Sequence, residues 1–209
     1  MNHLKRVFKI LFSPHNEWND IASADESPAS LCFGYVFPMV LAGSIAIFIG
    51  YGYVGYDSFL IKLKGVNWGW WFGLRHFISG IAVFFIATYV IDALAPFFSS
   101  DKNLSRSAQL VAYSSTPFWL SSLFSAFPFI GLLSVLGLYG VYLFYVGLPI
   151  MKHTPHDKRI IYMLVSAIII IVLTWILQWV TGMILNPLFG DPYASSAEDL
   201  RNLINGDSH

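Results

Sequence analysis

The chain has 209 residues, of which 56% are hydrophobic, 17% aromatic and only 11% charged. An ordinary soluble domain has roughly 25% charged residues, so the composition excludes a soluble protein and predicts a protein embedded in a membrane. Twelve basic and twelve acidic side chains cancel, which leaves no overall positive field to hold nucleic acid.

A cytoplasmic segment is predicted over residues 1–30. It is unlike a signal peptide, because it carries four acidic residues: Glu17, Asp20, Asp25 and Glu26. A short basic amphipathic helix is expected over residues 4–12, with one face formed by Leu4, Val7, Phe8 and Leu11. Such a helix either lies on anionic lipid or packs on the cytoplasmic end of a helix bundle. Ser13-Pro14 should end it, since the residue before a proline avoids helical angles.

Long stretches without Asp, Glu, Lys or Arg indicate the membrane spans. They cover residues 27–56, 107–151 and 160–190. Because a bilayer core about 30 Å thick needs roughly 20 helical residues, the longest stretch holds two spans and the others one each. The expected turn between those two is Phe127-Pro128-Phe129, because proline breaks the helical ladder. A fifth span is interrupted only by Arg75 and Asp92. The predicted spans are 31–54, 71–95, 107–127, 129–150 and 160–185.

The distribution of basic residues predicts the orientation of this all-α, five-helix bundle. A cytoplasmic N-terminus places eight basic residues inside: Lys5, Arg6, Lys9, Lys102, Arg106, Lys152, Lys158 and Arg159. The other side then receives only Lys62, Lys64 and Arg201. The C-terminus is therefore expected outside, and residues 188–209 are expected to form a polar tail.

Small residues at helical spacing mark the expected contact faces, because helices in lipid associate through close packing. They are Ala42, Ala46, Gly50, Gly73, Gly80, Gly140 and Gly147. These faces meet either within one bundle or between protomers.

Ionisable residues inside a span are candidates for function because they are costly there. The second span contains Arg75, His76 and Asp92. Arg75 and Asp92 are about 25 Å apart along one helix, so they cannot pair with each other. In the simplest interpretation both are interfacial: Arg75 reaches toward Asp57, and Asp92 meets Lys102 or Arg106. The alternatives are an ion or proton path and a packed polar network.

The third span is the most polar, and it contains a proline. Its hydroxyl-bearing residues include Tyr113, Ser114 and Thr116. Pro117 frees the backbone carbonyl near Tyr113, and hydroxyls in the same turn can satisfy it. Pro149 is expected to act similarly near the end of the fourth span. Such helices either line a polar cavity or pack against neighbours.

No motif for catalysis is present. The sequence has no phosphate-binding loop, zinc-protease helix, nucleophile elbow or dinucleotide fingerprint. The one cysteine, Cys32, excludes an internal disulfide. His153 and His156 are expected to be loop residues, because two ligands without a third make a weak metal site. We therefore expect no enzymatic activity, no metal and no cofactor.

Three segments together resemble the Yip1 family, in particular its bacterial inner-membrane branch. They are Leu-Phe-Ser-Pro-His-Asn-Glu-Trp-Asn-Asp-Ile at 11–21, Ala-Tyr-Ser-Ser-Thr-Pro at 112–117 and Tyr-Val-Gly-Leu-Pro at 145–149. The resemblance covers about residues 5–187 and implies a five-helix fold with a cytosolic N-terminus. Eukaryotic relatives associate with small GTPases and with one another in membrane traffic, but they do so through long N-terminal regions.

Two functions are compatible with these features. The first is a non-enzymatic membrane-organising or adaptor protein, with residues 31–187 as its transmembrane domain and other membrane proteins as partners in a homo- or hetero-oligomer. The second is a small-solute or ion conduit, or a transporter subunit, lined by the polar third span. The sequence identifies no small-molecule ligand.

Overall fold

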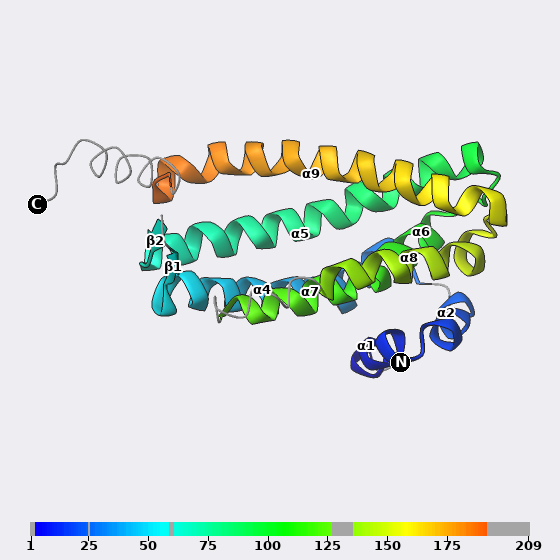
Figure 1. Ribbon diagram of the computed structural model, residues 1–209, viewed down its shortest axis with the longest axis horizontal. Helices are drawn as coiled ribbons and strands as arrows, with labels where there is room; N and C mark the ends of the chain where they lie inside the picture. Colours follow the sequence, from blue (N-terminus) through cyan, green and yellow to red (C-terminus); the bar gives the residue numbers. More distant parts are fainter. Residues whose placement is uncertain (1–2, 25, 59–60, 127–135, 192–209) are drawn as a thin grey trace, which may run out of the picture.

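The computed structural model describes residues 3–24, 26–58, 61–126 and 136–191. Figure 1 shows an elongated bundle in which the long helices run side by side, with two short helices against one side near one end. These two are α1 (His3–Phe12) and α2 (Pro14–Ala22). The break between them falls at Ser13-Pro14, as predicted, but the sequence analysis did not foresee that α2 is a helix.

One continuous helical segment follows, from Pro28 to Val54. It consists of α3 (Pro28–Leu31) and α4 (Phe37–Ile49), with wider π-helical turns at Cys32–Val36 and Gly50–Val54. The Ser27 hydroxyl accepts a hydrogen bond from the Ser30 amide at 3.2 Å and caps its start. A short antiparallel hairpin of β1 (Tyr56–Ser58) and β2 (Ile61–Leu63) then leads into α5 (Val66–Leu94).

The remaining elements complete the bundle. They are a 3₁₀ turn at Ala95–Phe98, α6 (Leu104–Ser114), α7 (Thr116–Leu123), a second such turn at Phe124–Ala126, α8 (Leu136–Lys152), a third at His156–Lys158 and α9 (Arg159–Phe189). In Figure 1, α5 lies between α9 on one side and the layer of α4, α7 and α8 on the other.

Within the described part of the chain, three helical segments are long and apolar enough to cross a membrane. They are Pro28–Val54, Val66–Phe98 and His156–Phe189. Helices also occupy the other two predicted positions, but α6 and α7 are short and α8 has 17 residues. The count of five spans and the orientation therefore stay predictions. The turn expected at 127–129 and most of the C-terminal tail lie outside the described residues.

Several predicted small residues lie where helices touch. A Cβ atom on Gly80 would lie 2.6 Å from a Val40 methyl group, and one on Gly73 would lie 3.1 Å from the Ser44 carbonyl oxygen. Gly50 similarly approaches the backbone of Ser125, and Ala46 is buried. These contacts join α4 to α5 and to the turn after α7.

Ala42 differs from the other members of this set. It is exposed, and the neighbouring Gly43 instead contacts Ser122 and His76. The prediction used steps of exactly four residues and therefore missed Gly43. A helix has 3.6 residues per turn, so a contact face combines steps of three and four residues. A role for Ala42 between protomers stays a prediction.

Gly140 on α8 offers a sharp test of this close packing. A Cβ atom there would lie 2.6 Å from the Ser114 carbonyl oxygen on α6, so Gly140→Ala should destabilise the protein by about 1–3 kcal/mol through overpacking. Thermal unfolding in detergent measures the change. Gly182→Ala is the matched control, because nothing lies within 4 Å of its added Cβ and alanine favours a helix by about 1 kcal/mol. Equal destabilisation of both variants would contradict the prediction.

Candidate functional site

A buried ionic network attaches the N-terminal helices to the bundle. Arg6 and Glu17 each have a side chain only 2% exposed, and Arg6 Nε lies 3.7 Å from Glu17 Oε1. Arg6 Nη1 also donates to Glu26 Oε1 at 3.0 Å and to the Tyr113 hydroxyl on α6 at 2.8 Å. The Tyr113 hydroxyl in turn donates to Glu26 Oε2 at 3.3 Å. One arginine therefore links α1, α2, the chain before α3, and α6.

Aromatic packing surrounds this network. The Tyr35 and Tyr113 rings have centroids 4.8 Å apart, and the Trp18 ring meets Tyr113 edge-on at 6.5 Å. Trp18 is fully buried. A Cβ atom on Gly147 of α8 would lie 2.8 Å from the Trp18 ring and 2.6 Å from a Leu110 methyl group. Gly147 thus leaves the space that the indole of Trp18 fills.

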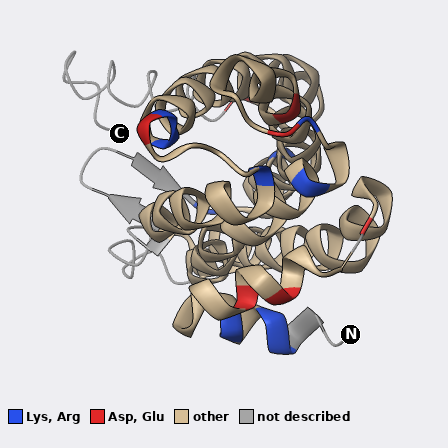
Figure 2. Cartoon of the chain, turned by 90° about the vertical axis from the view of Figure 1, so that its right-hand side faces the viewer, with Lys and Arg blue, Asp and Glu red and all other residues tan. Residues whose placement is uncertain are grey.

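The three segments singled out in the sequence meet at this place. Glu17 and Trp18 come from the first, Tyr113 and Thr116 from the second, and Gly147 from the third. We call the set Arg6, Glu17, Trp18, Glu26, Tyr113 and Gly147 the docking site. Figure 2 shows the basic and acidic segments of the N-terminal helices facing each other beside the bundle.

The docked position of α1 corrects the predicted helical face. Val7 and Ile10 are buried as expected of apolar residues, but Phe8 is 64% exposed. Arg6 lies outside the predicted apolar face and is nevertheless buried, because Glu17, Glu26 and Tyr113 supply partners for its guanidinium. The alternative in which α1 packs on the bundle therefore describes the structure. Leu4 lies among the residues whose side chains are not described.

The polar turn at Pro117 behaves as the sequence predicted. Helix α6 ends at Ser114 and α7 begins at Thr116, so the third predicted span is broken at this point. The Thr116 hydroxyl donates to the Tyr113 carbonyl at 2.8 Å and lies 2.6 Å from the Tyr35 hydroxyl. The Ser114 hydroxyl donates to the Leu110 carbonyl at 2.6 Å. In α8, by contrast, the helix continues through Pro149.

Asp92 forms an ion pair with a residue that the sequence analysis did not select for it. Lys152 Nζ, on a side chain with no exposed surface, lies 3.2 Å from Asp92 Oδ1. Nζ also donates to the Ser107 hydroxyl at 2.7 Å and the Asn103 carbonyl at 3.2 Å. The expected partners, Lys102 and Arg106, were chosen for proximity in sequence, whereas the end of α8 approaches more closely in space.

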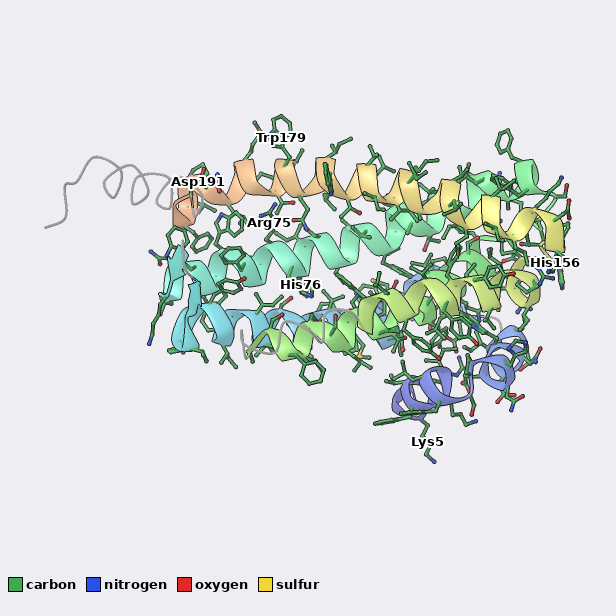
Figure 3. The ribbon with its side chains drawn as sticks, in the orientation of Figure 1. Lys5, Arg75, His76, His156, Trp179 and Asp191 are labelled. Carbon is green, nitrogen blue, oxygen red and sulfur yellow. The ribbon has the colours of Figure 1, made fainter. Side chains whose placement is uncertain are left out.

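Arg75 has a partner on α9 that the sequence analysis did not select. Its Nε donates to Gln178 Oε1 at 2.6 Å, and its Nη2 to the Gln178 carbonyl at 3.1 Å. Its guanidinium carbon lies 4.6 Å from the centroid of the Trp71 ring. Figure 3 shows Arg75 between α5 and α9. The predicted approach to Asp57 stays a prediction, since the Asp57 side chain is not described.

Two cavities adjoin this part of α5. One of about 310 Å³ lies between α5, the α6–α7 break, α8 and α9, and its lining includes Ser79, Phe84, Ser114, Phe144 and Ala167. The other, of about 640 Å³, is more open and includes Tyr51, Arg75 and Trp179. His76 and Gln178 line both. His76 Nε2 is buried without a hydrogen-bond partner among the described residues.

The predicted polar residues therefore separate into three places. Tyr113, Thr116 and Pro117 belong to the docking site or its edge, Asp92 to the pair with Lys152, and Arg75 and His76 to the cavities. Ser114 lines the smaller cavity, and Pro149 lines neither. The described residues contain no group of three or more His, Cys, Asp or Glu placed to hold a metal ion.

The apolar helices and buried polar clusters define an all-α integral membrane protein. The model of the Yip1 domain matches residues 8–177. The chain therefore belongs to the Yip1 family, which confirms the resemblance seen in the three segments. Neither a curated protein nor a solved structure matches it.

Proposed function

We propose that this protein is a non-enzymatic adaptor that organises other membrane proteins through its docked N-terminal helix. In this proposal five helices span the membrane, with α6–α7 and α8 as the third and fourth spans. The N-terminus is cytoplasmic, as the excess of Lys and Arg at that end supports. A bacterial inner membrane is the proposed location.

The exposed face of α1 carries the proposal. Phe12 is 82% exposed and Phe8 is 64% exposed, and the basic Lys5 and Lys9 lie on the same short helix. The ionic network holds this helix in one position although its outward face is apolar and basic. A held helix with exposed aromatic residues is suited to contact a partner, because little further ordering is needed when it binds.

A conduit is the alternative, and the hydroxyl groups of α6 and α7 weigh against it. The Thr116, Ser122 and Ser114 hydroxyls each donate to a backbone carbonyl within one turn. Hydroxyls engaged in this way stabilise a broken helix and are less available to replace the hydration of a moving ion. Ser114 and Ser115 do line the smaller cavity, so a measurement of solute flux through the reconstituted protein distinguishes the conduit from the adaptor directly.

Photocrosslinking from α1 tests the adaptor proposal. Phe12 is replaced by benzoylphenylalanine in the full-length chain, and native membranes are irradiated. We expect discrete adducts with a second copy or another membrane protein, and we expect Phe8→Ser in the same chain to reduce them severalfold. The matched control is benzoylphenylalanine at Phe97, an aromatic residue that is 78% exposed in the 3₁₀ turn after α5.

Two outcomes would contradict the proposal. One is crosslinking at Phe12 that gives only lipid adducts, as a helix resting on the bilayer would. The other is solute flux above that of empty liposomes when the purified protein is reconstituted, which would favour the conduit.

A further inference from the structure

Arg75 is a cation with no carboxylate beside it in the part of the chain that the structure describes. Its side chain lines the larger cavity. Both of its hydrogen bonds go to neutral oxygens of Gln178. A guanidinium has five N–H donors, so these two bonds leave three for a further acceptor.

The surrounding helices contain no acid that could neutralise it. Residues 27–56, 107–151 and 160–190, which include α4, α7, α8 and all but the first residue of α9, have neither Asp nor Glu. The other charged residue of α5, Asp92, lies about 25 Å further along the helix and is already paired with Lys152. A charge inside a span is costly unless it is paired, so this arrangement favours an anion that comes from outside these helices.

Arg75 lies about 4 Å inside the hydrocarbon core, close enough for its long side chain to reach the phosphate level of a bilayer. The segment Val66–Phe98 has 33 residues, hence a length of about 50 Å, which exceeds a hydrocarbon core of about 30 Å by roughly 10 Å at each end. Arg75 lies about 14 Å from the start of this segment. Trp175 and Trp179 of α9, both largely exposed, line the same cavity, and tryptophan is enriched at membrane–water interfaces.

An apolar cavity continues from this position into the bundle. The smaller cavity shares His76 and Gln178 with the larger one and extends along α5 past Phe84 and Ala87 to Ile91. Its walls are mainly hydrocarbon, which suits an acyl chain and not an ion. The volumes of about 310 and 640 Å³ lie within the range of about 300–1,000 Å³ typical of ligand sites.

We propose that Arg75 binds the phosphate of an anionic phospholipid whose acyl chain enters the cavity between α5, α8 and α9. A guanidinium binds phosphate through paired N–H donors, and the lipid's net negative charge neutralises the one cation that the span leaves unpaired. Gln178 holds the guanidinium in place from α9. Because this site is separate from α1, the proposal does not depend on the adaptor function.

Native mass spectrometry of the full-length protein in detergent tests the site. The probes are dioleoyl phosphatidylglycerol, dioleoyl phosphatidylcholine and inorganic phosphate. We expect one bound phosphatidylglycerol with an affinity about tenfold above that for phosphatidylcholine, because the choline cation of the latter offsets the charge of its phosphate. Arg75→Gln should abolish this preference, and Arg75→Lys should retain part of it. Arg159→Gln, a change on α9 outside both cavities, is the matched control.

Ala167→Phe tests the acyl-chain part of the site, because Ala167 lines the smaller cavity. It should weaken the binding of both lipids severalfold, while the preference for phosphatidylglycerol over phosphatidylcholine is kept. Gel filtration and thermal unfolding verify that each variant is folded.

Equal binding of the two lipids by the wild-type protein would overturn the proposal, and this result needs no variant. Displacement of phosphatidylglycerol by inorganic phosphate at similar concentration would also overturn it, because the site would then bind a free anion. Unchanged lipid binding by folded Ala167→Phe would exclude the cavity as the place of the acyl chain.

Discussion

Replacing Lys152 by methionine should lower the free energy of unfolding by about 3–5 kcal/mol, because it leaves the Asp92 carboxylate buried without its cation. Lys152 Nζ contacts Asp92, Ser107 and the Asn103 carbonyl, so one substitution removes three interactions. Equilibrium unfolding of the detergent-solubilised protein measures the loss. The conservative shape of methionine keeps the packing of the lysine stem.

The double variant Asp92→Leu, Lys152→Met separates charge from packing. A buried ion pair replaced on both sides by apolar residues often costs little, so most of the lost stability should return. Lys158→Met is the matched control, because Lys158 lies at the same end of the bundle but its side chain donates, among the described residues, only to the Ser99 hydroxyl at an exposed site. If Lys152→Met alone were as stable as the wild type, the Asp92–Lys152 pair would contribute little to the free energy of unfolding.

Replacing Arg6 by methionine should release α1 and α2 from the bundle. The change leaves the nearly inaccessible Glu17 carboxylate without Arg6 and removes the donor to Tyr113 and Glu26. A loss of about 3 kcal/mol or more is expected, which corresponds to amide exchange over 100-fold faster in residues 3–22. Hydrogen–deuterium exchange by mass spectrometry measures it.

Lys9→Met is the control on the same helix. Lys9 also pairs with Glu17, at 3.5 Å, but its side chain is 60% exposed, and exposed pairs contribute about 0–1 kcal/mol. Adding Glu17→Gln to Arg6→Met should restore part of the protection, because the uncompensated charge is then removed. Equal exchange rates of residues 3–22 in Lys9→Met and in Arg6→Met would refute a docking role for Arg6.

The apolar elements were predictable because their signal is local. The predicted spans 31–54, 71–95 and 160–185 lie inside the long apolar helical segments Pro28–Val54, Val66–Phe98 and His156–Phe189. The freed carbonyl at Tyr113 follows from Pro117 four residues later. Glycine contacts at Gly73, Gly80 and Gly140 also follow from residue size and helical spacing.

The pairing of charges was not predictable in the same way. Sequence neighbours suggested Lys102 or Arg106 for Asp92, but helices that fold back bring Lys152, sixty residues away, into contact. The burial of Arg6 was not predictable either, because its partners Glu17, Glu26 and Tyr113 are distant in the chain. A usable signal did exist for Gln178: it is one of only two amide side chains between residues 160 and 190, and a polar residue in a span usually has a partner.

The docking of α1 has a consequence for how the chain is made. Arg6 bonds to a tyrosine 107 residues later, and Trp18 fills the space beside Gly147. During synthesis, α1 therefore waits until the chain has been extended beyond Gly147 before its binding place exists. During that interval Ile10 and Arg6 lack their final contacts, and a basic amphipathic helix then binds the surface of the bilayer. Helix α1 then contacts lipid first, while the chain is being synthesised, and the bundle afterwards.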